Sequence, residues 1–138
     1  MIRLEKLSRE FQVGNQVVHA LDEVDLEIKE NEYVSIMGVS GSGKSTLLNI
    51  LGLLDTPTSG DYILSGINTS KMDDDEMAGI RSTKIGFVFQ SFHLIPRLTA
   101  FENIEMPMIL SGTNPKERSV KVSSALEKVG LTDRSDHK

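Results

Sequence analysis

The chain has 138 residues, of which 38% are hydrophobic and 25% charged, so it has room for one ordinary globular domain. It contains no cysteine, which excludes disulfides and thiolate metal sites. The net charge is −5 and the 15 basic residues are scattered, which argues against nucleic acid as the main partner.

The sequence shows no targeting or membrane-spanning segment. Charged and apolar residues mix at once in Met1-Ile2-Arg3, so we expect no signal peptide. The longest apolar stretch, 47–54, is interrupted by Asn49 and Gly52 and is far short of the ~20 residues that a membrane span needs. We therefore expect any contact with a membrane to be indirect.

The first half of the chain reads as strands on both sides of a glycine-rich loop. Alternating apolar and polar residues predict strands near residues 2–4 and 24–28, and the apolar run 33–37 is typical of a buried strand. A helix is predicted over 44–54. After a break at 57–60, a short strand over 61–64 is closed by a turn at Ser65 and Gly66.

The second half is predicted to be mostly helical. A helix is expected over 73–84 with acidic residues at its positive N-terminal end, and 85–89 is another strand candidate. Thr99 is suited to cap a helix that begins at Ala100. Pro107 is expected to kink or end that helix within two turns.

The last predicted helix has the clearest signals. Asn114 caps it, Pro115 occupies the first helical position, and Glu117 has the spacing of a capping box. Gly130 is expected to end it. One face carries four apolar residues, Val122, Ala125, Leu126 and Val129. The order of elements predicts an α/β domain with a β-rich N-terminal portion.

Residues 38–45 match the phosphate-loop pattern G-x-x-x-x-G-K-[ST] in full. The glycines let the backbone N–H groups point at phosphate oxygens, Lys44 is expected to reach the β- and γ-phosphates, and Ser45 to ligate Mg²⁺. The helix that follows directs its N-terminus at the anion. We expect the ligand to be Mg-ATP, and the expected contacts are Gly38, Val39, Ser40, Gly41, Ser42, Gly43, Lys44, Ser45 and Thr46.

Beyond this loop, the chain resembles the ATP-binding subunit of an ABC transporter, within the macrolide-exporter and lipoprotein-release branch. The resemblance is densest in "VSIMGVSGSGKSTLLNILGLLDTPTSGDYILSG" (34–66), "IGFVFQSFHLIPRLTAFENIEMP" (85–107) and "VGLTDRSDHK" (129–138). The stretch 34–66 contains the phosphate loop, and the stretch 85–107 is similar to that family's Q-loop region. Together they are far more specific than the phosphate loop alone.

The resemblance implies roles for individual residues. Phe11 stands where the family places an aromatic ring that stacks on adenine, with packing in the core as its alternative. Gln90 matches the Q-loop glutamine, which contacts Mg²⁺ and the attacking water, so Lys44 and Gln90 are the expected catalytic residues. Asn31 stands where the family usually has glycine, and asparagine tolerates the left-handed turn expected there.

As a whole, the resemblance implies a partial ABC ATP-binding domain over 1–138, with the P-loop at 38–45 and the Q-loop region at 85–96. It implies a P-loop NTPase of the ABC ATPase type, truncated before the signature motif and the second acidic strand. Such a chain is expected to expose apolar edges and to hydrolyse little ATP alone. The implied partners are transmembrane permease subunits, through the loop after Gln90, and a second ATP-binding domain in a homodimer. The implied location is the cytoplasmic face of the cell membrane.

Two other interpretations remain: a non-catalytic nucleotide-binding fragment, and a P-loop kinase or GTPase. The kinase or GTPase lacks support because the sequence has no Asn-Lys-x-Asp guanine-reading motif. Asp55 follows an apolar run like an acidic Mg²⁺ ligand, but it falls at the far end of the predicted helix, away from the phosphates. His19, His93 and His137 lack metal-ligand spacing and are interpreted as solvated or packed.

Overall fold

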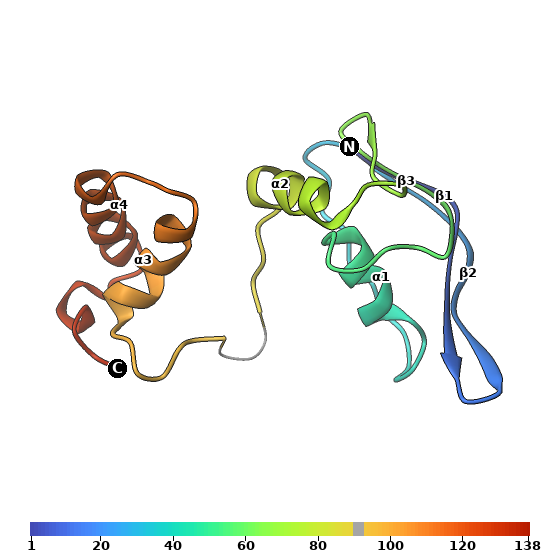
Figure 1. Cartoon of the computed structure of the whole chain (residues 1–138), viewed down its shortest axis with the longest axis horizontal. Coiled ribbons are helices and arrows are strands. Elements are labelled where there is room, and N and C mark those ends of the chain that lie inside the picture. Colours follow the sequence, from blue (N-terminus) through green and yellow to red (C-terminus); the bar gives the residue numbers. More distant parts are fainter. Residues whose placement is uncertain (90–92) are drawn as a thin grey trace. The chain divides into compact units, whose positions relative to one another are not determined.

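The structure is a computed structural model that describes residues 1–89 and 93–138. These residues form two compact units, 1–87 and 88–138, and each is described by itself. Figure 1 shows their elements along the chain.

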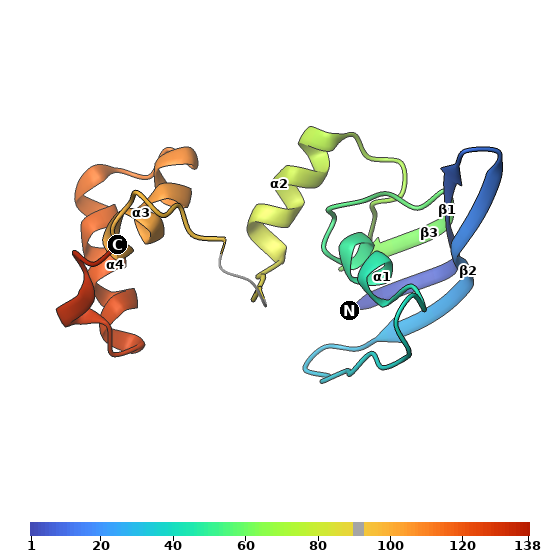
Figure 2. The ribbon, with the colours of Figure 1, turned by 90° about the horizontal axis from the view of Figure 1, so that it is seen from below.

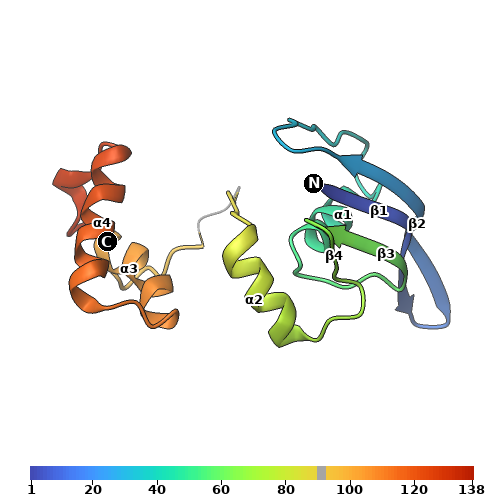
Figure 3. The ribbon, with the colours of Figure 1, turned by 90° about the horizontal axis from the view of Figure 1, so that it is seen from above.

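The first unit is built on a four-stranded antiparallel sheet with the strand order β2-β1-β3-β4 (Figure 3). This is the β-rich N-terminal portion that the sequence predicts, but its first two strands are much longer than expected. They are joined at Gly14, which has a φ of 60°, and Asn15, a pair whose chemistry is typical of a two-residue hairpin turn. The strands are β1 (Ile2–Val13), β2 (Gln16–Ile28), β3 (Ser59–Leu64) and β4 (Ile67–Asn68).

Bulges bend the β1–β2 ribbon, and Figure 2 shows the change in direction of its two strands. Lys6 and Glu23 have positive φ values of 46° and 42°. The backbone N–H of Lys6 donates to Asp25 Oδ1 at 2.8 Å, and that of Glu23 donates to Ser8 Oγ at 2.9 Å. Side-chain acceptors therefore satisfy the backbone where the strand ladder is interrupted.

The core of this unit combines side chains from the sheet, from α1 (Lys44–Leu51) and from α2 (Asp74–Lys84). The Tyr62 hydroxyl on β3 donates to the carbonyl of Leu51 at 2.8 Å, which fixes the C-terminal end of α1. That helix ends three residues earlier than predicted. The buried apolar side chains are Leu4, Leu7, Leu21, Leu47, Ile50, Leu53, Tyr62, Leu64 and Met77.

Two predicted strands are not formed within the described residues. Neither 33–37 nor 85–89 pairs with a neighbouring strand, and Tyr33 and Val88 are almost fully exposed. An apolar run becomes a strand only when another strand accepts its backbone hydrogen bonds, and the described chain offers none to these segments. They carry the exposed apolar surface that the sequence predicts.

The helix starts agree closely with the sequence. Asp73 Oδ1 accepts the N–H of Glu76 at 2.9 Å and the Glu76 carboxylate accepts the N–H of Asp73 at 3.1 Å, which closes a capping box at α2. Thr99 and Glu102 form the same box at α3 (Ala100–Leu110), with distances of 3.2 and 2.7 Å. Each box satisfies two otherwise unpaired backbone donors.

Pro107 lies inside α3, so the expectation that the helix could end there is wrong. The helix runs on to Leu110, and the N–H of Ser111 donates to the Pro107 carbonyl at 3.1 Å. A proline removes a single backbone donor from the helix. Here the capping box before it and the continued hydrogen bonding after it hold the helix together.

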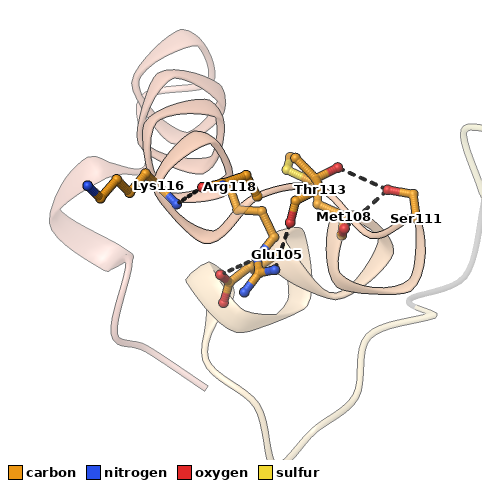
Figure 4. Close-up of polar contacts among 7 residues, drawn as sticks. Glu105, Met108, Ser111, Thr113, Lys116 and Arg118 are labelled. Atoms are coloured by element: carbon orange, nitrogen blue, oxygen red, sulfur yellow. Dashed lines mark hydrogen bonds and ion pairs between the residues drawn. The ribbon is translucent and has the colours of Figure 1, made fainter.

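The second unit joins α3 to α4 (Pro115–Lys128) through Arg118, as Figure 4 shows. The Arg118 Nε donates to Glu105 Oε1 and its Nη1 to the carbonyl of Thr113, each at 2.9 Å. The Arg118 and Glu105 side chains are only 18% and 22% exposed. The Ser111 hydroxyl adds bonds of 3.1 Å to the carbonyl of Met108 and to the hydroxyl of Thr113.

The start of α4 agrees with the sequence except for its capping box. Asn114 Oδ1 accepts the N–H of Lys116 at 3.0 Å, and Pro115 is the first helical residue. Glu117 pairs instead with Lys121, one turn along the helix, at 2.6 Å. The Glu117 carboxylate is therefore paired with Lys121 and does not close a capping box with Asn114.

The end of α4 departs from the predicted apolar face. Val122 and Leu126 are buried as predicted, but Val129 is exposed because the helix ends at Lys128 and Val129 is its C-cap. Gly130 has a left-handed φ of 69°, consistent with its predicted role as terminator. A short 3₁₀ turn, Thr132–Arg134, follows.

Alkaline pH is predicted to destabilise the first unit through Tyr62. Burial raises the pKa of Tyr62 from 10.0 to about 12. The unfolded chain releases this proton first, so the contribution is complete below the unfolded pKa and is lost progressively between pH 10 and about 12.

The ionisation of Tyr62 can be followed in a Tyr33→Phe chain, where Tyr62 is the sole tyrosine. The absorbance of tyrosinate should titrate near pH 12 in the folded chain and near pH 10 in urea. A chain in which both Tyr33 and Tyr62 are replaced by phenylalanine is the absorbance blank. Titration of Tyr62 at the same pH with and without urea would contradict the assignment of a buried phenol.

Candidate functional site

The glycine-rich loop lies immediately before α1 and curls through two left-handed glycines. Gly41 and Gly43 have φ values of 81° and 85°, a conformation that disfavours residues with a Cβ. The N–H of Ser42 donates to the Val39 carbonyl at 3.3 Å, and that of Leu47 to the Gly43 carbonyl at 2.9 Å. The loop therefore turns sharply into the helix, as the motif predicts.

Gly43 is also where the loop touches the sheet. A Cβ at this position would lie 2.3 Å from the carbonyl oxygen of Ala20 on β2 and 3.1 Å from a methyl group of Leu21. No side chain fits in that gap. Glycine is required here by both backbone conformation and close approach, so the loop is seated on β2.

The N-terminus of α1 has neither a side-chain cap nor an acidic residue beside it. Its N-cap, Gly43, makes no side-chain hydrogen bond, and its first turn contains no acidic residue. The other α-helices of the described chain are capped by the side chains of Asp73, Thr99 and Asn114. The free N–H groups and positive dipole end of α1 can therefore receive an anion.

The Lys44 side chain folds back over the loop. Its Nζ donates to the Val39 carbonyl at 2.6 Å and lies 3.4 Å from Ser42 Oγ. The ammonium group thus lies among the residues that the sequence assigns to phosphate. This placement adds a full positive charge to the dipole of α1.

A hollow of about 210 Å³ lies where the loop meets β2. Five of its lining residues, from Gly41 to Thr46, are among the nucleotide contacts that the motif predicts. The sequence did not indicate the three from β2. The Gly14–Asn15 turn could have, because it sets the β1–β2 pairing that brings this strand to the loop. The lining residues are Val18, His19, Ala20, Gly41, Gly43, Lys44, Ser45 and Thr46.

Phe11 lies at the surface beside this hollow. It is 38% exposed, so it is not a core residue. Its cross-strand partner is Val18, which lines the hollow. Directly paired residues of antiparallel strands project from the same face, so Phe11 and Val18 lie on one face of the β1–β2 ribbon.

The other predicted site residues are placed as follows. Gln90, the expected Q-loop glutamine, lies outside the described residues. Asn31 has a φ of 61°, which confirms the left-handed turn. Asp55 forms an ion pair with Arg9 just beyond α1. His19 Nδ1 lies 3.2 Å from Glu10 Oε1.

Metal-ligand clusters and membrane-spanning helices are both absent from the described residues. Between 1–89 and 93–138, no group of three or more His, Asp or Glu side chains is arranged to hold a metal ion. Over the same residues, no helix combines the length and the apolar character needed to cross a bilayer.

The family model for ABC transporters matches residues 21–138. The chain belongs to the ABC transporter family. It is 53% identical over 137 residues to YknY of Bacillus subtilis, an uncharacterized ABC transporter ATP-binding protein, covering 99% of this chain and 60% of the relative. It is 49% identical over 138 residues to the macrolide export ATP-binding/permease protein MacB of Brucella abortus, covering 100% of this chain and 21% of MacB.

Solved structures show that this chain has the fold of an ABC ATP-binding cassette. It superposes with a TM-score of 0.89 and 46% identity on a dimeric, post-hydrolysis structure of the ATP-binding cassette MJ0796 of Methanocaldococcus jannaschii, bound to ADP and Pi. The match covers 100% of this chain and 61% of that one. The predicted fold class, an α/β P-loop NTPase of the ABC ATPase type with an antiparallel N-terminal portion, is confirmed. The chain spans about 60% of the length of these ATP-binding relatives.

The contact between Gly43 and Ala20 leads to a prediction. Gly43→Ala should destabilise the first unit by more than the ~1–2 kcal/mol of left-handed strain alone, because the added Cβ must also push the loop off β2. Urea unfolding measures the stability of the variant, and nucleotide titration measures its affinity for ATP.

Gly66→Ala is the matched control. Gly66 has nearly the same φ, 84°, but an added Cβ would meet nothing within 4 Å. It should show the strain without the displacement and keep its nucleotide affinity. Equal losses in the two variants would show that the loop is not held against β2.

Proposed function

We propose that this chain binds Mg-ATP as the ATP-binding part of an ABC transporter. The observation that carries the proposal is the uncapped N-terminus of α1 at a glycine loop, with Lys44 folded over it. A triphosphate supplies the negative charge and the acceptor oxygens that these groups lack.

The roles follow from the chemistry of the loop. The backbone from Gly38 to Thr46 would hold the phosphates, with Lys44 neutralising the β- and γ-phosphates. Ser45, in the first turn of α1 and lining the hollow, offers a hydroxyl for Mg²⁺. The metal, when bound, would neutralise charge on the transferring phosphoryl group. We assign Gln90 as a second Mg²⁺ contact that also orients the attacking water.

Within the family, we propose that 1–138 is part of an ATP-binding domain, with the P-loop at 38–45 and the Q-loop region at 85–96. The sequence contains no Leu-Ser-Gly-Gly signature, and after the phosphate loop no apolar run ends in Asp-Glu. Hydrolysis needs an oriented nucleophile as well as charge neutralisation. We therefore expect the 138 residues to bind ATP and to hydrolyse it very slowly by themselves.

The partners are also proposals. The solved structures of the MJ0796 cassette are dimeric, and the MacB relative is by name an ATP-binding/permease protein. These relatives support a homodimer of ATP-binding domains that meets permease subunits through the loop after Gln90, at the cytoplasmic face of the membrane. Binding and hydrolysis of ATP would then be coupled to export or extraction of a lipoprotein, a peptide or an amphiphilic drug.

A non-catalytic nucleotide-binding fragment is the second candidate, favoured by the absence of a general base among the assigned residues. A P-loop kinase or GTPase is disfavoured by membership of the ABC transporter family. Comparing ATP with GTP binding and measuring phosphate release would separate these candidates.

Lys44→Ala should abolish Mg-ATP binding, because it removes the one lysine or arginine among the described residues that line the hollow. Isothermal titration calorimetry of the 138-residue chain measures the affinity. Lys121→Ala is the control, since Lys121 pairs with Glu117 on α4 of the other unit. Unchanged affinity in Lys44→Ala would sink the phosphate-loop assignment.

Gln90→Ala tests the Q-loop assignment in a protein of the relatives' full length. ATP affinity should be largely retained, whereas hydrolysis coupled to transport should fall by about a hundred-fold to a thousand-fold, the range for losing one positioned polar group. Phosphate release in vesicles containing the permease measures it. A wild-type rate would remove Gln90 from the proposed mechanism.

A further inference from the structure

Arg9 lies over the ring of Phe11. The two residues are separated by one position on β1, so their side chains project from the same face of the strand. The guanidinium carbon lies 4.7 Å from the ring centroid, a distance typical of a cation–π contact. One face of the ring is therefore occupied by a cation, while Phe11 remains 38% exposed.

Arg9 is itself held in place by Asp55. Its Nε donates to Asp55 Oδ2 at 3.0 Å and its Nη2 to Oδ1 at 2.7 Å, so the pair is bidentate. The side chains are only 23% and 25% exposed. Asp55 Oδ1 also accepts the N–H of Thr56 at 2.8 Å, which orients the carboxylate. A planar guanidinium with two such bonds has little freedom to leave the ring.

The segment after α1 is tied to β1 on both sides of Arg9. The N–H of Thr58 donates to the Ser8 carbonyl at 2.8 Å, and the N–H of Glu10 donates to the Thr58 hydroxyl at 3.0 Å. These bonds fix where Asp55 stands relative to the strand. Since α1 carries the phosphate loop at its other end, this helix connects the loop to the segment that holds Arg9.

We propose that Arg9 is a positioning residue for the nucleotide base. It holds one face of the Phe11 ring, so that the opposite face is presented to the base next to Val18 and the hollow. A ring that is already oriented loses less rotamer entropy when a base stacks on it. The inference rests on the proposed nucleotide function and adds Arg9 and Asp55 to it, with adenine as the stacking partner.

A purely structural role makes a different prediction. If the Arg9–Asp55 pair only ties β1 to the loop after α1, its loss would lower stability and weaken every ligand of the phosphate loop alike. A role in positioning the base affects only ligands that contain one. Comparing ATP with inorganic tripolyphosphate therefore separates the two.

The experiment titrates both ligands, with Mg²⁺, into the 138-residue chain. Phe11→Ala should weaken ATP by about ten-fold, the range of a base–aromatic stack, and leave tripolyphosphate unchanged. Arg9→Gln should weaken ATP by about two- to five-fold, again without changing tripolyphosphate. Arg9→Lys, which keeps the cation, should recover part of the loss.

Coupling between the two residues is the sharper test. In a Phe11→Ala background, Arg9→Gln should cause no further loss of ATP affinity, because Arg9 acts through the ring. Arg3→Gln is the matched control, since Arg3 also lies on β1 and pairs with a carboxylate, that of Glu5. It should change neither affinity. If Arg9→Gln fails to fold, Asp55→Asn, which keeps Arg9 and removes its anchor, should show the same selective loss.

Several results would overturn the inference. Equal weakening of ATP and tripolyphosphate by Arg9→Gln would make Arg9 a structural tie only, and so would an additive loss in the double variant. Wild-type ATP affinity in Phe11→Ala, alongside no binding in Lys44→Ala, would leave the phosphate site standing without base positioning. Failure of the unmodified chain to bind either ligand would remove the proposed function itself, and this inference with it.

Discussion

The site depends on a gap between Gly43 and the carbonyl of Ala20 that is too small for a methyl group. Through this contact the glycine loop is seated on β2, and α1 starts from a defined point on the sheet. Leu47 and Ile50 then enter the core with Leu21 and Tyr62. A displaced loop would shift α1, so phosphate-binding geometry and core packing are determined by the same contact.

The N-terminus of α1 lacks the stabilisation of a side-chain cap, and its backbone N–H groups are left available to an anion. Asp73, Thr99 and Asn114 satisfy backbone donors at the other helix starts, a contribution of roughly 1 kcal/mol each. Gly43 makes no such bond, so α1 relies on burial of its apolar face and on the Tyr62 bond at its far end. The preference for a capped helix start is therefore not met at the proposed phosphate site, and contacts elsewhere in α1 compensate for the missing cap.

Features decided by neighbouring residues were predictable. The starts of α2, α3 and α4 were each predicted within one residue, because a cap depends on a few consecutive side chains and backbone groups. The phosphate loop was predictable for the same reason, since eight consecutive residues carry the backbone shape and the charge. The strands predicted at 33–37 and 85–89 are not formed in the described residues, because a strand depends on backbone partners that a local run of residues does not supply.

The sequence by itself therefore determined the phosphate loop, the helix caps and, through resemblance, the ABC transporter family. Only the tertiary structure placed Val18 and Ala20 against the loop, and Arg9 between Asp55 and Phe11. These residues are separated by up to 46 positions in the chain and have no pattern in common. The bulged register of β1 and β2 and the path of the chain after α1 bring them together, and neither can be read from a local run of residues.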